Sequence, residues 1–346
     1  MIGIAMFITA LAMLALGFPV AFTFGGVAVI FGLLADGPAM FSLMPHRIFS
    51  VMNNTILMAI PLFIFMGIVL QKSRLAERLL ESMGSLFGEI RGGIAISTVL
   101  VGGLLAASTG VVGASVVAMG VISLPVMLKH GYDKRLATGT ICAAGTLGQI
   151  IPPSIILIIL GDVFQEPVGD LFKAAFWPGV ALMGVYVVYV LIVTIVNPAL
   201  APPVRLANTG ETKSRQVRAA LLAILPPLVL IVLVLGSILL GVATPTESSA
   251  VGGVGAIVLA MIYRQASFRM VWDSARETVK ISAMVFAILI GATAFSMVFT
   301  YTGADAIVEE VMLQLPGEKW GFLIVSMAAI MALGFFIDFV EIAYII

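Results

Sequence analysis

Hydrophobic and polar residues follow one another along the chain in long blocks. A spanning helix needs about 20 mostly apolar residues, and most of the charge-free blocks fit a single pass. A transmembrane β-barrel would instead show strands of about ten residues with alternating polarity. The pattern therefore predicts an all-α polytopic membrane protein. The charge-free blocks are 1–35, 48–71, 92–128, 136–161, 174–204, 219–246, 248–263, 281–304 and 320–337.

The first block is too long for one pass and is interrupted by Gly17-Phe18-Pro19. Proline inside a helix removes a hydrogen bond and bends the helix. The block therefore forms either one long bent helix or two short ones. It lacks the basic start of a secretory signal peptide and is longer than one.

Composition narrows the function classes. Of the 346 residues, 61% are hydrophobic and 10% are charged, whereas soluble domains are near half apolar and a quarter charged. Eighteen basic residues balance eighteen acidic ones, so no basic surface for nucleic acid is expected. Cys142 is the single cysteine, and His46 and His130 are the two histidines. We therefore expect no transition-metal site and no Ser–His or Cys–His enzyme.

The charges between the blocks predict the orientation. Fifteen of the 18 Lys and Arg residues fall in four clusters, which the positive-inside rule places in the cytoplasm. The acidic loops around Asp162 and Glu309 then face outward. The basic clusters are Lys72/Arg74/Arg78/Arg91, Lys129/Lys134/Arg135, Arg205/Lys213/Arg215/Arg218 and Arg264/Arg269/Arg276/Lys280.

The block 92–128 begins and ends beside cytoplasmic clusters. Its 37 residues fall short of the roughly 40 that two crossings and a turn require. Its middle, Ala107-Ser108-Thr109-Gly110, has the composition of a turn. The favoured interpretation is a re-entrant helical hairpin that enters from the cytoplasm. The alternative is one tilted span that violates the charge rule.

Two segments, 74–89 and 268–280, have apolar residues at helical spacing on one face and charges on the other. We expect both to lie as helices at the cytoplasmic interface and to act as arms that brace a scaffold. Segment 197–216 contains Asn197-Pro198 and Pro202-Pro203 and is predicted to be a polar cytoplasmic linker.

A weak internal repeat relates the two ends of the chain at an offset of 229 residues. Gly88-Glu89-Ile90-Arg91-Gly92 then aligns with Gly317-Glu318-Lys319-Trp320-Gly321. Segment 72–91 is basic, whereas 301–319 is acidic, so the copies have opposite sidedness. This pattern is typical of inverted-repeat transporters, whose substrate and ions bind near the bilayer centre.

The same offset places Asp338 opposite Thr109, at the tip of a second hairpin. A carboxylate at the centre of a membrane helix costs ~2.5–3.5 kcal/mol, so it would face a polar cavity or a cation. The alternative is that the apolar segment ends at residue 337 and that Asp338 is interfacial.

The motif Gly145-Thr146-Leu147-Gly148-Gln149-Ile150-Ile151-Pro152-Pro153-Ser154 lies within the block 136–161. A Pro-Pro pair cannot continue a regular helix, and unwound backbone at membrane depth must be buried or line a cavity. Backbone carbonyls that no longer accept helical hydrogen bonds could bind Na⁺. The hydroxyls of Ser108, Thr109, Ser115 and Thr146 could add further oxygen ligands. The alternative is a structural proline kink.

These motifs resemble the large, DctM-like membrane subunit of tripartite ATP-independent periplasmic (TRAP) transporters. The hairpin Thr109-Gly110, then Leu124-Pro125-Val126-Met127 and Gly131-Tyr132, and then Gly148–Ser154 stand in the family's order. Ile60–Gly67, Ala243–Glu247 and the Asp338 segment add to the likeness, which covers the whole chain.

The resemblance implies a subunit of the bacterial inner membrane that takes up a small organic acid with sodium. It implies two partners, a small DctQ-like membrane subunit and a periplasmic DctP-like binding protein. It also implies an elevator motion of the ion transporter superfamily type. The expected cation site comprises Ser108, Thr109, Gly110, Gly145, Thr146 and Asp338, and the expected substrate site is lined by Ser115, Gln149, Pro152, Pro153 and Ser154.

On this basis we divide the chain into four parts. These are scaffold and first arm (1–91), hairpin and broken helix (92–161), scaffold, linker and second arm (162–280), and the start of the second repeat (281–346). The sequence departs from the family at Thr109-Gly110-Val111, where many members have Ser-Gly-Ser. Members also continue beyond Ile346, so we expect this sequence to be truncated.

The sequence leaves other functions open. A sodium–dicarboxylate symporter that works without a binding protein would lack a copurifying small subunit. An intramembrane serine protease would need a Ser paired with a His or Lys at depth, and the charge-free blocks contain neither His nor Lys. A passive channel would show filter elements around an axis along the membrane normal, whereas this repeat is inverted.

Overall fold

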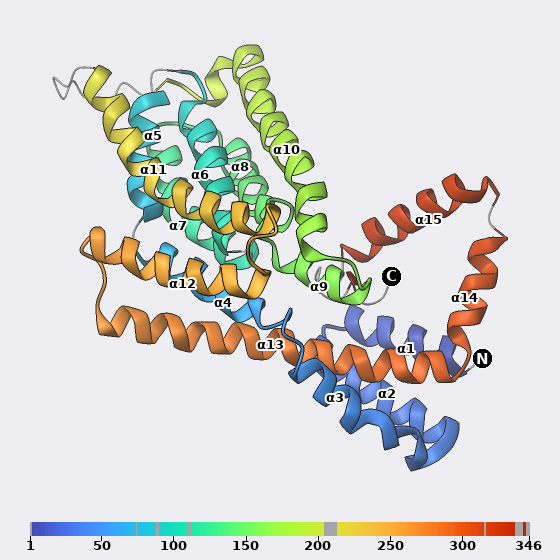
Figure 1. The fold of residues 1–346 in the computed structure, drawn as a ribbon. Coiled ribbons are helices and arrows are strands. Elements are labelled where there is room, and N and C mark those ends of the chain that lie inside the picture. Colours follow the sequence, from blue (N-terminus) through green and yellow to red (C-terminus); the bar gives the residue numbers. More distant parts are fainter. Residues whose placement is uncertain are drawn as a thin grey trace. The chain divides into compact units, whose positions relative to one another are not determined.

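The computed structural model is built from helices throughout the part of the chain that it describes (Figure 1), residues 2–73, 75–87, 90–109, 112–203, 213–314, 316–335 and 342–343. The helices are α1 (Ile2–Ala15), α2 (Val20–Asp36), η1 (Gly37–Leu43), α3 (Met44–Met52), α4 (Ala59–Lys72), α5 (Leu75–Phe87), α6 (Gly93–Thr109), α7 (Val112–Lys129), α8 (Lys134–Thr146), η2 (Leu147–Gln149), α9 (Ile155–Val163), α10 (Val168–Val196), η3 (Pro198–Leu200), α11 (Lys213–Leu239), α12 (Pro245–Ile262), α13 (Phe268–Tyr301), α14 (Ala304–Leu313) and α15 (Glu318–Leu333).

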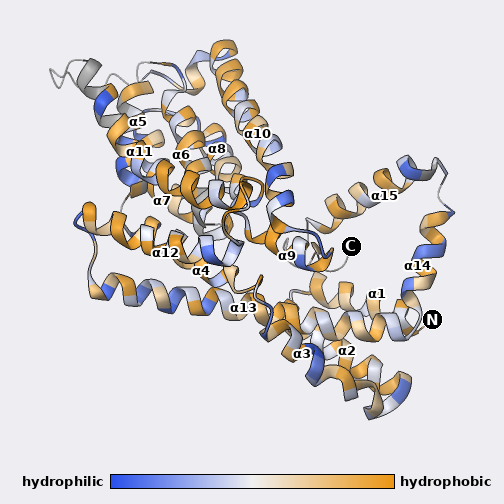
Figure 2. Ribbon diagram, in the orientation of Figure 1, coloured by the Kyte–Doolittle hydropathy of each residue, from blue (hydrophilic) through white to orange (hydrophobic). Residues whose placement is uncertain are grey.

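Within these described residues, five helical stretches are long and apolar enough to cross a membrane. A sixth is possible if the bent pair α4–α5 counts as one span. The helices are mostly apolar along their length, whereas the first half of α13 carries a series of hydrophilic residues (Figure 2). The five stretches are Val20–Met52, Val168–Val196, Leu221–Leu239, Pro245–Ile262 and Phe268–Tyr301. The prediction of a polytopic helical membrane protein is confirmed.

The chain divides into two compact units, one made of residues 1–55 and 280–346 and the other of residues 56–279. In the first unit, α2 packs on the second half of α13 through the ring pair Phe24–Phe295, whose centroids are 5.1 Å apart. Gly291 sits directly against the Ala21 backbone. The Tyr301 hydroxyl donates to the Asp36 carboxylate at 2.8 Å.

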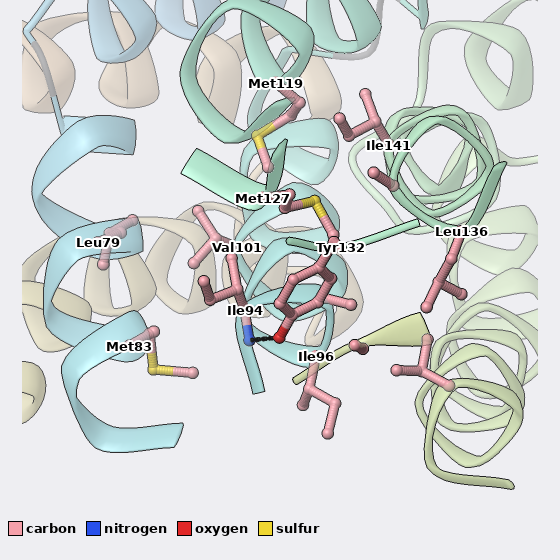
Figure 3. Packing of buried hydrophobic residues seen from close by; sticks show 14 of the residues in the cluster. Leu79, Met83, Ile94, Ile96, Val101, Met119, Met127, Tyr132, Leu136 and Ile141 are labelled. Carbon is pink, nitrogen blue, oxygen red and sulfur yellow. Dashed lines mark hydrogen bonds between the residues drawn. The ribbon is translucent and has the colours of Figure 1, made fainter. Parts of the chain in front are cut away.

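The second unit holds the hairpin and the broken helix that the sequence singled out. One apolar core of this unit joins α5, α6, α7 and α8, with Leu79, Val101, Met119, Met127 and Ile141 buried in it (Figure 3). This core fixes the positions of the helices that carry the candidate site.

The charge-free block 1–35 forms two short helices and not one long bent helix. α1 ends at Ala15 and α2 begins at Val20. Between them Gly17 has φ +86°, a left-handed conformation that glycine adopts at little cost. The two helices pack against each other.

Two sequence predictions about helix boundaries are wrong. The block 48–71 is not a single pass, because α3 ends at Met52 and α4 begins at Ala59, and the polar Asn53-Asn54-Thr55 between them favours a turn. Segment 268–280 is not a separate interfacial helix, because it continues without a break into the 34-residue α13. No glycine or proline lies between Phe268 and Ile290 to end that helix.

Candidate functional site

The predicted hairpin is present as two helices whose open ends meet. α6 has 17 residues and α7 has 18. Over the stretches Gly93–Leu105 and Ser115–Lys129, both are apolar helices shorter than the candidate spans. Tyr132, just beyond α7, accepts a hydrogen bond from the Ile94 backbone N–H near the start of α6, at 3.2 Å (Figure 3). The chain therefore enters and leaves the hairpin at the same end, as the sequence predicted.

A short backbone segment fixes this open end. The Gly92 N–H donates to the Ala201 carbonyl at 3.3 Å, and the Asp133 N–H donates to the Leu200 carbonyl at 2.8 Å. Burial raises the pKa of the Tyr132 phenol from its ordinary value, and the hydrogen bond from Ile94 offsets part of that rise. Residues 200–201 fall in the segment 197–216, predicted to be a linker, and nothing in their composition marks them as an anchor.

The broken helix is present, and its break begins later than predicted. The Asp133 carboxylate caps α8 by accepting from the backbone N–H groups of Arg135 and Leu136. α8 then runs through Gly145 and Thr146, so the prediction of unwound backbone at these two residues is wrong. One 3₁₀ turn follows, and irregular backbone spans 150–154 before α9 begins at Ile155.

The irregular segment is enclosed by protein, as backbone outside a helix must be at membrane depth. Ile151, Pro152, Pro153 and Ser154 are all buried. The peptide bond between the two prolines is cis. The Ser154 hydroxyl donates to the Gln149 backbone carbonyl at 2.6 Å and so closes the turn.

Close contacts at glycines join the hairpin to the end of α8. A side chain on Gly145 would collide with Val116 of α7, whose backbone N lies 3.1 Å from the Cβ position. A Cβ on Gly102 of α6 would lie 2.6 Å from the Ala144 side chain. Gly145, whose carbonyl is a predicted ligand, is therefore also a packing glycine, and Gly102 is a packing position that the sequence predictions did not include. The Gly102-Gly103 pair within an apolar run was the available signal.

The Gln149 side chain is the most informative polar group in this region. Both polar atoms of its amide are buried, and neither has a hydrogen-bond partner among the described residues. A buried amide without partners costs ~1–3 kcal/mol. By contrast, the exposed Thr146 hydroxyl is satisfied by the Ala143 carbonyl at 2.9 Å.

The structure brings together part of the predicted site. Ser115 is buried in α7 next to Val116, which contacts Gly145, and Gln149 and Pro152–Ser154 follow directly on the same chain. The remaining predicted residues lie outside the description: Gly110 and Asp338 entirely, and Ser108 and Thr109 in their side chains. No contact between them and the α8 end is therefore assigned.

The orientation of the hairpin can be tested by labelling. In a chain whose exposed Cys142 is replaced by alanine, we expect Ile90→Cys and His130→Cys to react with an impermeant maleimide from the same face of the membrane. Both positions lie at the open end of the hairpin. Reaction from opposite faces would show that residues 92–128 cross the bilayer and would exclude the re-entrant arrangement.

An apolar helical chain with a hairpin packed against a broken helix defines a polytopic membrane permease. Its residues 7–346 match the model of the family described as "Tripartite ATP-independent periplasmic transporter, DctM component", and the chain belongs to this family. It is a multi-pass protein of the inner membrane and the large permease subunit of a transporter, not an enzyme.

Curated relatives agree with this assignment. The chain is 32% identical over 293 residues to a C4-dicarboxylate TRAP transporter large permease protein from Pseudomonas aeruginosa. The matched region covers 84% of this chain and 67% of the relative. It is 33% identical over 301 residues to an ectoine/5-hydroxyectoine large permease protein from Ruegeria pomeroyi, covering 85% and 68%. An isethionate TRAP transporter permease protein from Oleidesulfovibrio alaskensis is 28% identical over 333 residues, covering 94% and 50%.

Proposed function

We propose that this subunit takes up a small organic acid, delivered by a periplasmic binding protein, and that a sodium gradient drives the uptake. The observation that carries the proposal is the buried segment 151–154 close to the Gln149 amide, which has no partner among the described residues, packed beside the hairpin. The names of the relatives refer to a dicarboxylate, ectoine and isethionate, which are small polar solutes. A small DctQ-like membrane subunit is the third component of the proposed system.

The atoms at the break suit a hard cation and a carboxylate in different ways. Na⁺ prefers oxygen ligands such as backbone carbonyls, amide oxygens and hydroxyls. The Gln149 Oε1 atom is such an oxygen, and the Gln149 Nε2 amide can donate to a substrate carboxylate. We assign the cation to the hairpin tip Ser108-Thr109-Gly110 and the end of α8, and the substrate to the neighbourhood of Ser115, Gln149 and Pro152–Ser154.

Helix boundaries support the inverted repeat on which the second half of the site depends. Tyr301, the end of α13, lies 229 residues after Lys72, the end of α4. Ala304, the start of α14, lies 229 residues after Leu75, the start of α5. Sequence identities had suggested the same offset, while the first copy is basic and the second is acidic. On this basis Asp338 belongs to a second hairpin opposite Thr109.

An elevator motion needs a rigid moving part and a braced frame. The close glycine contacts of Gly102 and Gly145 would let the hairpin and the broken helix move together. The first half of α13 is tied to the end of α4 by the ion pair Lys72–Glu277, with Nζ and Oε2 2.9 Å apart. The Arg78 guanidinium of α5 lies over the Tyr263 ring at 5.2 Å. These contacts are the proposed braces.

The hairpin tip is testable at one hydroxyl. We expect Thr109→Ala to raise the sodium concentration needed for half-maximal uptake, because the tip would lose one of its few oxygen ligands. A loss of ~1 kcal/mol, taken to be of the same order as one hydrogen bond, corresponds to roughly a fivefold increase. Thr138→Ala in the exposed first turns of α8 is the matched control. An unchanged sodium dependence in Thr109→Ala would remove this residue from the site.

Asp338 is testable by removing its charge and keeping its shape. In the full-length subunit, we expect Asp338→Asn to abolish sodium-coupled uptake, because a neutral amide no longer balances the bound cation. The variant should still insert and bind its small subunit, which copurification measures. Normal uptake by Asp338→Asn would show that this carboxylate is interfacial.

The second candidate function is a sodium–dicarboxylate symporter that works without a binding protein. The two functions separate in proteoliposomes that contain the subunit with or without a binding protein and a small membrane subunit. The proposal requires both partners for uptake. Full activity of the isolated subunit would favour the symporter.

A further inference from the structure

Two loops of the unit 56–279 lie side by side at one end of its helices. Gly169, at the start of α10, packs against Ile238, near the end of α11, with the Ile238 carbonyl oxygen 3.6 Å from the position of a Gly169 Cβ. The loop between α9 and α10 therefore lies beside the loop between α11 and α12. We refer to residues 162–170 and 240–247 as the paired loops.

The paired loops lie on the opposite face of the membrane from the open end of the hairpin. A Cβ on Gly92 would lie 2.9 Å from the Thr194 side chain, so α10 ends at the open end of the hairpin (Figure 1). α10 is a candidate span of 29 residues, or about 43 Å, which exceeds a hydrocarbon core of about 30 Å. Because the basic open end is placed in the cytoplasm, the paired loops face outward.

The paired loops carry four acidic side chains and no basic one. Lys173, just beyond the first loop, pairs with Asp170 at 3.1 Å, and no other Lys or Arg occurs in 136–204 or 219–263. The acidic surplus favours a partner with a basic face and disfavours the anionic headgroups of the membrane. The four acids are Asp162, Glu166, Asp170 and Glu247.

The first loop is a tight corner that exposes an aromatic ring. The Glu166 N–H donates to the Gly161 carbonyl at 2.9 Å. Gln165 has φ +56°, and its side-chain amide donates to the Asp162 backbone carbonyl at 2.6 Å. Phe164 is nevertheless 58% exposed. A backbone fixed in this way has little freedom left to lose when a partner binds.

The second loop adds two apolar side chains beside a fixed acid. Leu240 is 81% exposed and Val242 is 78% exposed. The Thr244 hydroxyl accepts the Glu247 N–H and the Glu247 carboxylate accepts the Thr244 N–H, which forms a capping box at the start of α12. This gives the sequence motif 243–247 a structural role. Exposed apolar side chains among charges are typical of a protein–protein interface.

We propose that the paired loops are the docking surface for the periplasmic binding protein, and that the face of that protein which contacts them is basic. Phe164 is the apolar anchor, and the acids steer the encounter. The proposal rests on the proposed function and adds where the binding protein docks and which charge its docking face carries.

Phe164→Ala tests the apolar anchor. Uptake is measured in proteoliposomes that contain the full-length subunit and its small membrane subunit, at rising concentrations of purified binding protein. We expect the concentration of binding protein at half-maximal uptake to rise roughly tenfold, with an unchanged maximal rate and unfolding temperature. Phe268→Ala is the control, because this 86% exposed phenylalanine lies beside a basic cluster of the other face, and it should behave as the unmodified subunit.

The double variant Glu166→Gln/Glu247→Gln tests the charge. Glutamine can keep the capping box of α12, so the loop should hold its shape. We expect the variant to need roughly fivefold more binding protein at low salt and to depend less on ionic strength than the unmodified subunit does. Glu81→Gln, at an exposed acid of α5 outside the paired loops, is the matched control and should change neither quantity.

Three results would overturn the inference, and they can be told apart. Uptake without any binding protein would contradict the proposed function itself. If uptake needs the binding protein but both variants reach half-maximal uptake at the unmodified concentration, the proposed function stands and the docking surface lies elsewhere. If Phe164→Ala loses the small membrane subunit on copurification, that subunit covers the paired loops and the binding protein does not.

Discussion

Replacing Gln149 by leucine is expected to abolish sodium-driven uptake without destabilising the protein. Both polar atoms of the amide are buried and lack a hydrogen-bond partner among the described residues. Leucine has a similar size and leaves no polar atom unpaired, so the free energy of unfolding should stay the same or rise by ~1–3 kcal/mol. The measurements are uptake into proteoliposomes and the unfolding temperature of the purified subunit.

Ser123 provides the matched control for this experiment. It is 2% exposed in α7, and its hydroxyl also lacks a partner within the described parts of the chain, but it is not part of the break. Ser123→Ala should leave uptake intact. If Gln149→Leu transports normally, the amide is a tolerated defect of packing and the substrate site lies elsewhere.

Gly145→Val is expected to stop uptake for a different reason, namely by forcing the hairpin away from α8. The Cα and N atoms of Val116 lie 3.0 Å and 3.1 Å from the position of a Gly145 Cβ, and backbone atoms cannot rotate aside as a side chain can. Overpacking of this kind costs on the order of 1–3 kcal/mol. Both the unfolding temperature and the uptake rate should therefore fall.

Gly139 is the control within the same helix. Because no atom lies within 4 Å of a Gly139 Cβ, Gly139→Ala should keep its uptake and gain ~1 kcal/mol in stability from the higher helix propensity of alanine. If Gly145→Val were as stable and active as Gly139→Ala, the close approach of α7 and α8 would have no role in holding the site.

The sequence predicted those features of the fold that depend on local composition. α6 ends at Thr109 and α7 begins at Val112, on either side of the predicted turn, and the Pro152-Pro153 pair lies in the irregular backbone before α9. The amphipathic segment 74–89 is the separate helix α5. In each case a proline, a glycine or a helical charge pattern determines the local structure.

Features that depend on tertiary packing were not predictable in this way. The amphipathic half of α13 has the same pattern as α5, yet it continues into a span because no residue interrupts it. Gly145 was predicted to lie in unwound backbone, but packing against Val116 keeps it in the last turn of α8. The anchoring of Gly92 and Asp133 by the carbonyls of Ala201 and Leu200 is made by backbone groups, which carry no sequence signal.

Sodium-driven uptake is tested most directly in proteoliposomes that contain the full-length subunit, its small membrane subunit and its periplasmic binding protein. A candidate organic acid, such as a C4-dicarboxylate, is added outside together with an inward sodium gradient. The account predicts accumulation of the acid above its outside concentration, and collapse of that accumulation when sodium is equal on both sides. Equal accumulation with and without the sodium gradient would contradict it.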